Sequence, residues 1–299
     1  MLLAATVQGL KTQRVALREL QTNLSTRAAL AALPGQLLPV GTVEFVRAAM
    51  SARRVDEPPA MGYEGVRDFL HREVVRTTLG EARQRKKPFF IKPVATKLFD
   101  GFVYDTEHLT GHSWQQIDRM ATLDASTPVW VSSVVEFVCE WRYYVDASGK
   151  ILARARYDAD GDDDAPLPVA EVVQSAIDAT VTRLLAQGTP HPFAIDMGVL
   201  TNGRTAVCEL NDAWSIGLYA HACTPSGAAW KPDEYLEFLL ARWRSIVANS
   251  GVRLPGSRRQ VDEDDDDEEE PTAAVAAKPA RRGRPPKVRE PGNKSADSV

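Results

Sequence analysis

Three oxygen-bearing side chains, Asp196, Glu209 and Asn211, are the residues whose types and spacing point most directly to chemistry. They lie in two apolar runs that flank Asn202-Gly203, a dipeptide typical of a two-residue hairpin turn. Such a turn places Asp196 opposite Glu209, and because side chains alternate along a strand, Asn211 shares their face. Opposed carboxylates repel unless a cation compensates them, and hard oxygen ligands suit Mg²⁺. The pattern predicts a magnesium site; the alternative is a hairpin with one solvated polar face.

Basic side chains upstream could hold the anionic groups of a ligand. Lys92 lies near the end of the apolar run 89–93, and Lys97 lies in the loop that follows. Arg142 and Arg156 belong to a second predicted hairpin. Taken singly, Lys92 has a plainer interpretation as a solvated lysine at a strand end. The arginines could equally form an exposed basic face that pairs with the acidic loop after them.

The elements that must position these residues can be outlined from hydrophobic periodicity and turn signals. Helices are expected within residues 1–33 and over 65–85, 167–188 and 235–248. Strands are expected over 89–93, 128–139, 140–145 and 150–157, together with the hairpin of 192–211. This mixture of helices and hairpins predicts an α+β fold.

Composition places the chain among globular proteins. It has 299 residues, 44% hydrophobic and 25% charged, with a net charge of −4, which is enough for one or two domains. The three cysteines, Cys139, Cys208 and Cys223, show no CxxC spacing, which indicates reduced thiols and a cytoplasmic location. His108 and His112 are separated by a segment containing Thr-Gly, so a polar loop is favoured over zinc binding. No apolar run approaches the roughly 20 residues of a membrane span, and the start lacks the basic region of a secretory signal.

The last part of the chain differs in composition. Residues 262–270 are nine consecutive acids, and a Pro/Ala/Lys/Arg segment follows, which predicts disorder. Residues 280–287 resemble an AT-hook, whose extended core lies in the minor groove of A·T-rich DNA. The residues that would enter the groove are Arg282, Gly283, Arg284 and Pro285. The alternative is a solubilising tail.

The motifs occur in an order that resembles the ATP-grasp superfamily, and most closely a poorly characterised bacterial and phage group within it. They are Phe-Ile-Lys-Pro at 90–93, Val-Glu-Phe-x-x-Glu-x-Arg at 135–142, Asp196, and Glu-Leu-Asn at 209–211. The resemblance covers roughly residues 40–245. It implies an α+β, ATP-grasp fold in which two α/β subdomains clasp a nucleotide between antiparallel sheets. The expected domains are a helical, substrate-side region at 1–85, the ATP-grasp domain at 86–250, and a disordered tail at 251–299.

The resemblance also implies roles for individual residues. Lys92 would contact the α- and β-phosphates of ATP, and Lys97 would reach the phosphates from its loop. The segment 132–135 would hold the adenine edge through Ser133 and Val134. The ribose would be bound by Glu136 or Glu140, of which Glu140 is favoured. Arg142 and Arg156 would face the phosphates or the reacting carboxylate, and Asp196, Glu209 and Asn211 would hold Mg²⁺. One departure from the family is the loop 94–101, which has one glycine where the family is rich in Gly and Ser.

The implied function is an ATP- and Mg²⁺-dependent ligase. It would join a carboxylate to an amine or a thiol through an acylphosphate, with a peptide or an amino acid as substrate. Replacing Asp196 or Glu209 with alanine is expected to abolish ATP turnover and leave the fold intact. One alternative is a metal-dependent nuclease that uses Asp196 and Glu209, although the lysine usual in such hairpins is missing at position 211. The other is a non-catalytic DNA-associated protein.

Overall fold

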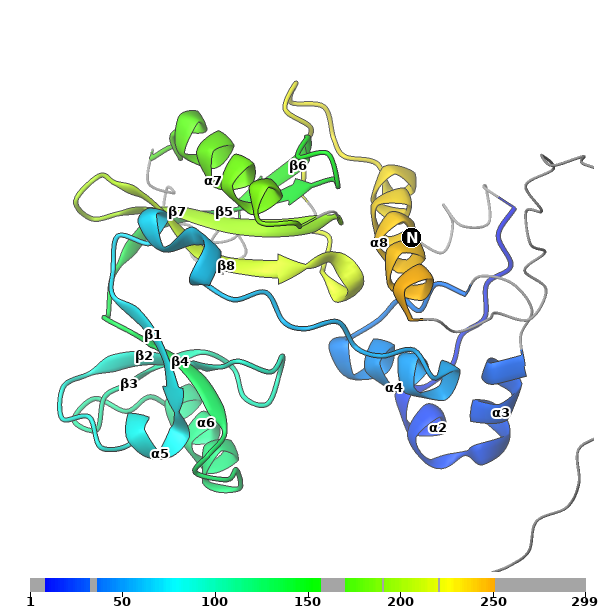
Figure 1. Ribbon diagram of the computed structural model, residues 1–299, viewed down its shortest axis with the longest axis horizontal. Coiled ribbons are helices and arrows are strands. Elements are labelled where there is room, and N and C mark those ends of the chain that lie inside the picture. The colour runs from blue at the N-terminus through cyan, green and yellow to red at the C-terminus, as the bar shows by residue number, and fades with distance from the viewer. Residues whose placement is uncertain (1–8, 33–36, 157–169, 190, 220, 251–299) are drawn as a thin grey trace, which may run out of the picture. The chain divides into compact units, whose positions relative to one another are not determined.

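The computed structural model describes residues 9–32, 37–156, 170–189, 191–219 and 221–250. These residues form two four-stranded antiparallel sheets with helices against them (Figure 1). The predicted disordered tail and the four AT-hook residues Arg282, Gly283, Arg284 and Pro285 lie outside the described residues, as does the acidic loop after Arg156.

The first sheet, sheet A, has the strand order β1-β4-β2-β3. Its strands are β1 (Val74–Thr78), β2 (Phe89–Pro93), β3 (Phe102–Tyr104) and β4 (Pro128–Ser132). Alternate residues such as Phe89 and Ile91 are buried in a cluster with α5 (Leu79–Ala82) and α6 (Gly111–Ala121). Because side chains alternate along a strand, Phe90 and Lys92 point to the other face of sheet A.

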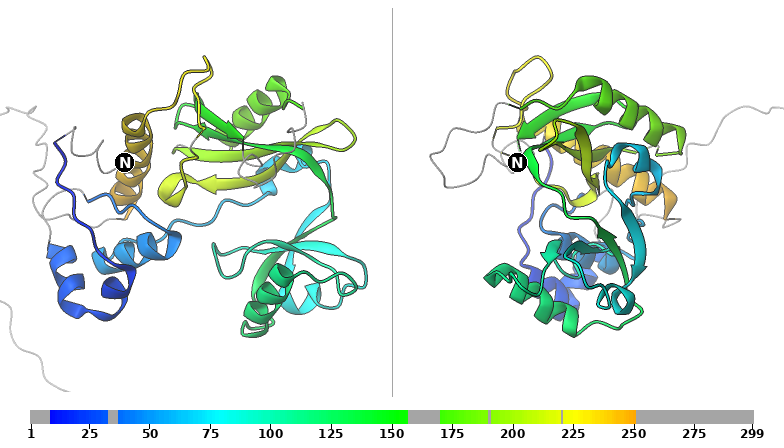
Figure 2. Two further views of the ribbon diagram at one scale, coloured as in Figure 1. Left: turned by 180° about the vertical axis from the view of Figure 1, so that it is seen from behind. Right: turned by 90° about the vertical axis from the view of Figure 1, so that its left-hand side faces the viewer.

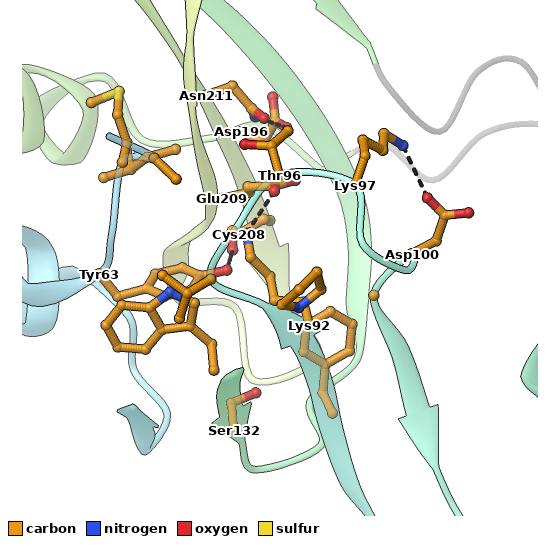
Figure 3. A pocket seen from close by; sticks show the side chains of 18 of the residues that line it. Tyr63, Lys92, Thr96, Lys97, Asp100, Ser132, Asp196, Cys208, Glu209 and Asn211 are labelled. Atoms are coloured by element: carbon orange, nitrogen blue, oxygen red, sulfur yellow. Dashed lines mark hydrogen bonds and ion pairs between the residues drawn. The ribbon is translucent and has the colours of Figure 1, made fainter. Parts of the chain in front are cut away.

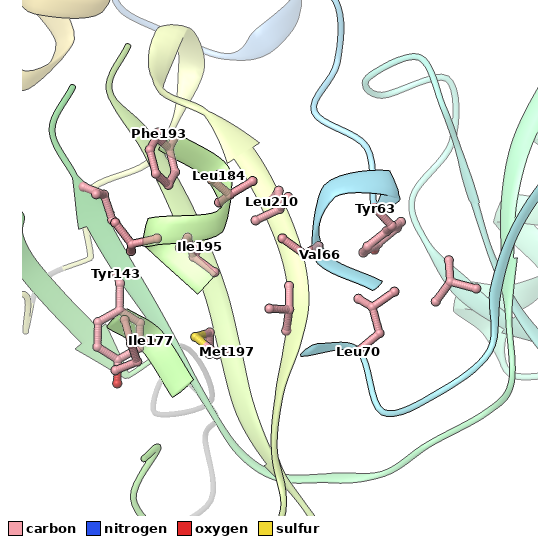
Figure 4. Packing of buried hydrophobic residues seen from close by; sticks show 14 of the residues in the cluster. Tyr63, Val66, Leu70, Tyr143, Ile177, Leu184, Phe193, Ile195, Met197 and Leu210 are labelled. Atoms are coloured by element: carbon pink, nitrogen blue, oxygen red, sulfur yellow. The ribbon is translucent and has the colours of Figure 1, made fainter. Parts of the chain in front are cut away.

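The second sheet, sheet B, has the strand order β6-β5-β7-β8. Its strands are β5 (Phe137–Val145), β6 (Ile151–Arg156), β7 (Phe193–Leu200) and β8 (Thr205–Asp212). One face is covered by α7 (Gln174–Ala186), which crosses the sheet in the views of Figures 1 and 2, and by the 3-10 helix η1 (Glu64–Phe69). Ile177, Ile195 and Leu210 belong to the buried cluster on this face (Figure 4).

The remaining helices pack at the opposite face and the end of sheet B. They are α2 (Leu17–Thr22), α3 (Leu24–Ala32), α4 (Val43–Arg53), η3 (Ala213–Ser215) and α8 (Pro232–Asn249). Tyr144 on β5 packs against Phe238 on α8. The guanidinium of Arg242 on α8 donates to both carboxylate oxygens of Asp212, and this buried pair fixes the end of β8 against the helix.

The helix predicted over residues 65–85 is wrong. The structure divides this segment into η1, β1 and α5. The apolar spacing was real, since Val66, Leu70 and Val74 all belong to the cluster below sheet B. However, the β-branched run of β1 pairs along its whole length with β4, and that tertiary pairing overrides the helical period. The predicted domain boundary at residue 86 therefore falls inside sheet A.

The single strand predicted over residues 128–139 is also wrong. It ends at Ser132 in sheet A and resumes at Phe137 in sheet B. Residues 133–136 connect the two sheets. Strand propensity is continuous across this segment, so it gives no sign that the chain changes sheets.

The β7–β8 hairpin reaches the predicted pairing by an unpredicted route. The loop has three residues, 201–203, because Leu200 N–H donates to Arg204 O, and Gly203 has a φ of 80°. This shifts the register by one residue, so that Met197 faces Val207. A β-bulge then shifts it back, and Asp196 faces Glu209 as predicted.

Candidate active site

A cavity of about 880 Å³ contains most of the residues singled out in the sequence. Sheet A contributes Lys92 and Trp130, and sheet B contributes Asp196 and Glu209. Tyr63, which precedes η1, lies against it as well (Figure 3). A volume of this size is in the usual range for small-molecule and cofactor sites, about 300–1,000 Å³.

Three charged side chains form a row across sheet B at the base of the cavity. Arg142 on β5 faces Asp196 on β7, which faces Glu209 on β8. The Arg142 Nε and Nη2 atoms donate to Asp196 Oδ1 and Oδ2 at 2.7 and 2.6 Å, a two-pronged charge-assisted pair. Asn211 Nδ2 also donates to Asp196 Oδ2, at 3.0 Å. Asp196 is 3% exposed, and its burial raises the pKa of the carboxyl although Arg142 opposes this shift.

Lys92 joins this row from sheet A. Its Nζ lies 2.6 Å from Glu209 Oε1, and the Tyr63 ring centroid is 5.0 Å from the ammonium (Figure 3). Burial favours a higher pKa for Glu209, but the charge and hydrogen bond of Lys92 outweigh it and lower that pKa. Burial also opposes the charged form of Lys92, yet Glu209 raises the pKa of the ammonium on balance. Two cations and two carboxylates thus compensate one another inside the cavity.

Lys97 lines the cavity from the loop between β2 and β3. It adopts a left-handed backbone conformation with a φ of 64°, and its Nζ lies 3.0 Å from Asp100 Oδ1. Arg47 on α4 donates to the neighbouring Thr96 carbonyl at 3.0 Å. This loop is therefore held by side-chain and backbone contacts in place of the glycine-rich backbone usual in the family.

The connection between the sheets lies along the same cavity. Ser133 and Val134 line it, as does Glu140 at the start of β5. Glu136 is exposed and is not among the lining residues; its carbonyl accepts from Thr201 N–H. Of the two candidate ribose ligands, the structure thus places only Glu140 at the cavity.

Arg156 lies elsewhere, and the expectation that it faces the same site as Arg142 is wrong. It pairs with Trp141 across β5 and β6. Trp141 packs against the cluster on the α7 face of sheet B, whereas its neighbour Arg142 points into the cavity. Paired residues share a face, so Arg156 lies on the α7 side and does not line the cavity.

The sequence analysis missed three cavity residues. Arg72 and Tyr63 come from the region where no motif was recognised, and both donate hydrogen bonds to the β8 backbone. Tyr219, after η3, places its ring 5.3 Å from the Arg142 guanidinium. A lone arginine or tyrosine outside a motif gives no signal in a single sequence, because its partners are backbone groups distant in the chain.

The donor set at the row fits a hard divalent cation. Asp196, Glu209 and Asn211 offer carboxylate and amide oxygens from adjacent strand positions on one face, the chemistry that suits Mg²⁺. Within the described residues, no group of three or more His, Cys, Asp or Glu side chains is arranged to hold a metal. The thiolate and imidazole ligands typical of zinc are therefore not gathered anywhere in that part of the chain.

None of the helices in the described ranges is both long enough and apolar enough to span a membrane. Comparison with curated proteins found no match.

Solved structures with a similar arrangement include ATP-grasp ligase PsnB complexed with minimal precursor. It shares 18% identity with a TM-score of 0.37, over 58% of this chain and 55% of that one. D-alanine–D-alanine ligase from Bacillus anthracis complexed with ATP shares 15% identity with a TM-score of 0.39, over 62% of this chain and 63% of that one. The chain thus spans less than two thirds of the length of these proteins.

The match to a protein family is more extensive. Residues 69–226, more than half of the chain, match a family described as an ATP-grasp domain, the second family of its clade. The matched segment begins at the end of η1 and runs through both antiparallel sheets, past all the residues of the charged row. This protein therefore belongs to that family of ATP-grasp domains, with the α+β fold of the superfamily.

Proposed function

We propose that this protein is an ATP- and Mg²⁺-dependent ligase that joins a carboxylate to an amine or a thiol through an acylphosphate. The observation that carries the proposal is the cavity in which Lys92 from sheet A meets the row Arg142–Asp196–Glu209 of sheet B. Phosphoryl transfer needs cations around the phosphates and oxygen ligands for a divalent metal, and it needs no covalent nucleophile from the protein.

In this proposal the two ends of the cavity have different tasks. The connection carrying Ser133 and Val134 holds the adenine edge, and Glu140 accepts from the ribose hydroxyls. Lys92 and Lys97 donate to the phosphate oxygens. Asp196, Glu209 and Asn211 hold Mg²⁺, which when bound neutralises charge that develops on the phosphates.

The positive side chains orient the reacting groups. Arg142 is fixed by its paired hydrogen bonds with Asp196 and by the Tyr219 ring, so its guanidinium keeps one orientation without loss of further rotamer freedom. We place the acid to be activated beside Arg142. We also propose that the region before β1, including α4, forms the substrate side, since Val43 of α4 lines the cavity. The substrate class in this proposal is a peptide or an amino acid, and the cytoplasmic location stays a prediction.

The proposal is tested first by nucleotide binding and then by turnover. ATP should raise the melting temperature of the full chain, and the increase should depend on Mg²⁺. ADP release should then appear only when a carboxylate and an amine or a thiol are supplied together. DNA cleavage in Mg²⁺ without ADP release would instead support the nuclease alternative, and the absence of any Mg²⁺-dependent nucleotide effect would overturn the proposal.

Lys92→Ala should mainly weaken nucleotide binding. The ammonium is the cation that sheet A contributes beside Glu209, and its loss removes a donor to the phosphates. We expect the Kd for ATP, measured by calorimetry, to rise about 10-fold or more, equivalent to roughly 1.4 kcal/mol. Lys87→Ala is the matched control, because Lys87 lies exposed just before β2. Equal affinities in the two variants would remove Lys92 from the phosphate site.

A further inference from the structure

The bulge in β8 decides which side chains face the cavity. Between the turn and the bulge, Val207 faces Met197, and both are buried in the α7-side core. Beyond the bulge, Leu210 takes the core position opposite Ile195. Without the extra residue, Cys208 would face Asp196. Since a one-residue slip exchanges the two faces of a strand, Glu209 would then point into the apolar core.

The bulge has a recognisable backbone signature. Arg72 Nη1 donates to Val207 O at 2.6 Å, and Arg72 Nη2 donates to Cys208 O at 2.9 Å. In a regular strand, consecutive carbonyls point to opposite sides, so one guanidinium reaches both only where the alternation is broken. β8 is also the edge of sheet B, where no further strand supplies donors. The Tyr63 hydroxyl adds a third donor, at 3.0 Å from Cys208 O.

Arg72 itself is held in place. Its Nη1 also lies 3.3 Å from Leu70 O, and its guanidinium carbon is 5.8 Å from the ring centroids of Tyr63 and Phe137. A planar fork with several N–H donors can serve two carbonyls at once, and a lysine ammonium on a flexible stem cannot reproduce that geometry. Arg72 therefore matches the bulge in shape as well as in charge.

We propose that Arg72 is a positioning residue that locks the β8 bulge and thereby keeps Glu209 and Asn211 on the same face as Asp196. The inference deepens the proposed function, on which it rests, because it assigns the register of the metal ligands to a residue outside the ligand set. Arg72 touches the backbone of the residues just before Glu209 and does not contact the ligand carboxylates themselves in the hydrogen bonds of the described residues.

The test uses Arg72→Lys and Arg72→Ala in the full chain, with three measurements. The first is the Mg²⁺ concentration that gives half of the ATP-dependent rise in melting temperature. The second is ATP affinity in EDTA. The third is hydrogen exchange of the amides of residues 207–211. We expect the half-saturating Mg²⁺ concentration to rise about 10–100-fold, as for outer-shell partners of metal ligands. Exchange at the bulge should quicken, while ATP affinity in EDTA stays close to that of the unchanged protein.

Arg183→Lys is the matched control. Arg183 forms an ion pair with Asp68 on neighbouring η1 at 2.7 Å, but it is half exposed and distant from the bulge backbone. Tyr63→Phe, which removes only the third donor, should give a smaller shift of the same kind. If Arg72→Ala fails to fold, Arg72→Lys decides the question through the same three measurements.

The outcomes separate this inference from the function it builds on. If the unchanged protein shows no Mg²⁺-dependent response to ATP, the proposed function fails, and hydrogen exchange alone still tests whether Arg72 holds the bulge. If the unchanged protein responds and Arg72→Lys needs the same Mg²⁺ concentration, with unchanged exchange at 207–211, the inference is overturned. An equal loss of ATP affinity with and without Mg²⁺ would also overturn it, because that pattern places Arg72 on the nucleotide.

Discussion

Asp196→Ala is expected to lower the free energy of unfolding by about 3–5 kcal/mol, the range found when one partner of a buried ion pair is removed. Asp196 is 3% exposed, and its carboxylate satisfies two guanidinium nitrogens of Arg142. Arg142 is itself 8% exposed, so the substitution leaves a buried cation without this counter-charge. The sequence-based expectation that this substitution leaves the fold intact therefore does not survive the burial of the pair.

Urea unfolding followed by circular dichroism measures this effect. The matched control is Asp68→Ala, which removes an exposed carboxylate from a surface pair with Arg183 and should cost at most about 1 kcal/mol. The double variant Arg142→Met/Asp196→Leu removes both charges at once and should recover most of the loss. An Asp196→Ala protein as stable as the Asp68→Ala control would mean that Arg142 is solvated in solution.

Glu209→Gln should give the largest loss of activity with little loss of stability. The Glu209 side chain is 42% exposed at the cavity, so an amide there is not buried without partners. The substitution keeps the shape but removes a charged oxygen from the proposed metal ligands. Outer-shell partners of metal ligands already cost about 10–100-fold when removed, so we expect ADP release to fall at least about 100-fold.

Steady-state ADP release at saturating ATP, measured over a range of Mg²⁺ concentrations, tests this prediction. The control is Glu237→Gln on α8, where the carboxylate is exposed and lies 4.0 Å from Arg244. The unfolding free energy of both variants should stay within about 1 kcal/mol of the parent, as is usual for exposed sites. Normal turnover in Glu209→Gln with unchanged Mg²⁺ dependence would remove Glu209 from the metal site.

The two carboxylates are compensated in different ways, and this explains why the two substitutions should differ. Asp196 is held within sheet B by Arg142, whereas Glu209 is held by Lys92, which comes from sheet A. Removing Glu209 frees a lysine whose long stem can bring its ammonium toward solvent. Removing Asp196 leaves a buried guanidinium at the base of the site, where no such movement is available.

Part of the site was accessible from the sequence because it depends on local rules. Strand alternation and a short hairpin placed Asp196, Glu209 and Asn211 on one face, and the structure has them there. The strand that ends near Lys92 was also predicted correctly, since apolar residues alternate along β2. These inferences need only a few neighbouring residues and the geometry of a single strand or turn.

Other features required information from distant residues. Arg156 was misplaced because the face of an edge strand depends on its register with β5, which the hairpin sequence alone did not establish. The 65–85 helix was misread because β1 obtains its hydrogen bonds from β4, more than fifty residues later by the paired positions Val74 and Ser132. Local propensity is weaker than such long-range pairing.

The amino-acid sequence by itself determined the ligand types, their order along the chain and the family resemblance that this order carries. The tertiary structure alone decided how the hairpin reaches its register. A three-residue turn displaces β8 by one position and the bulge at Cys208 restores it, so two deviations cancel. The carbonyls that this bulge exposes are satisfied by Arg72, more than 130 residues earlier, because buried backbone groups must find donors wherever the fold brings them.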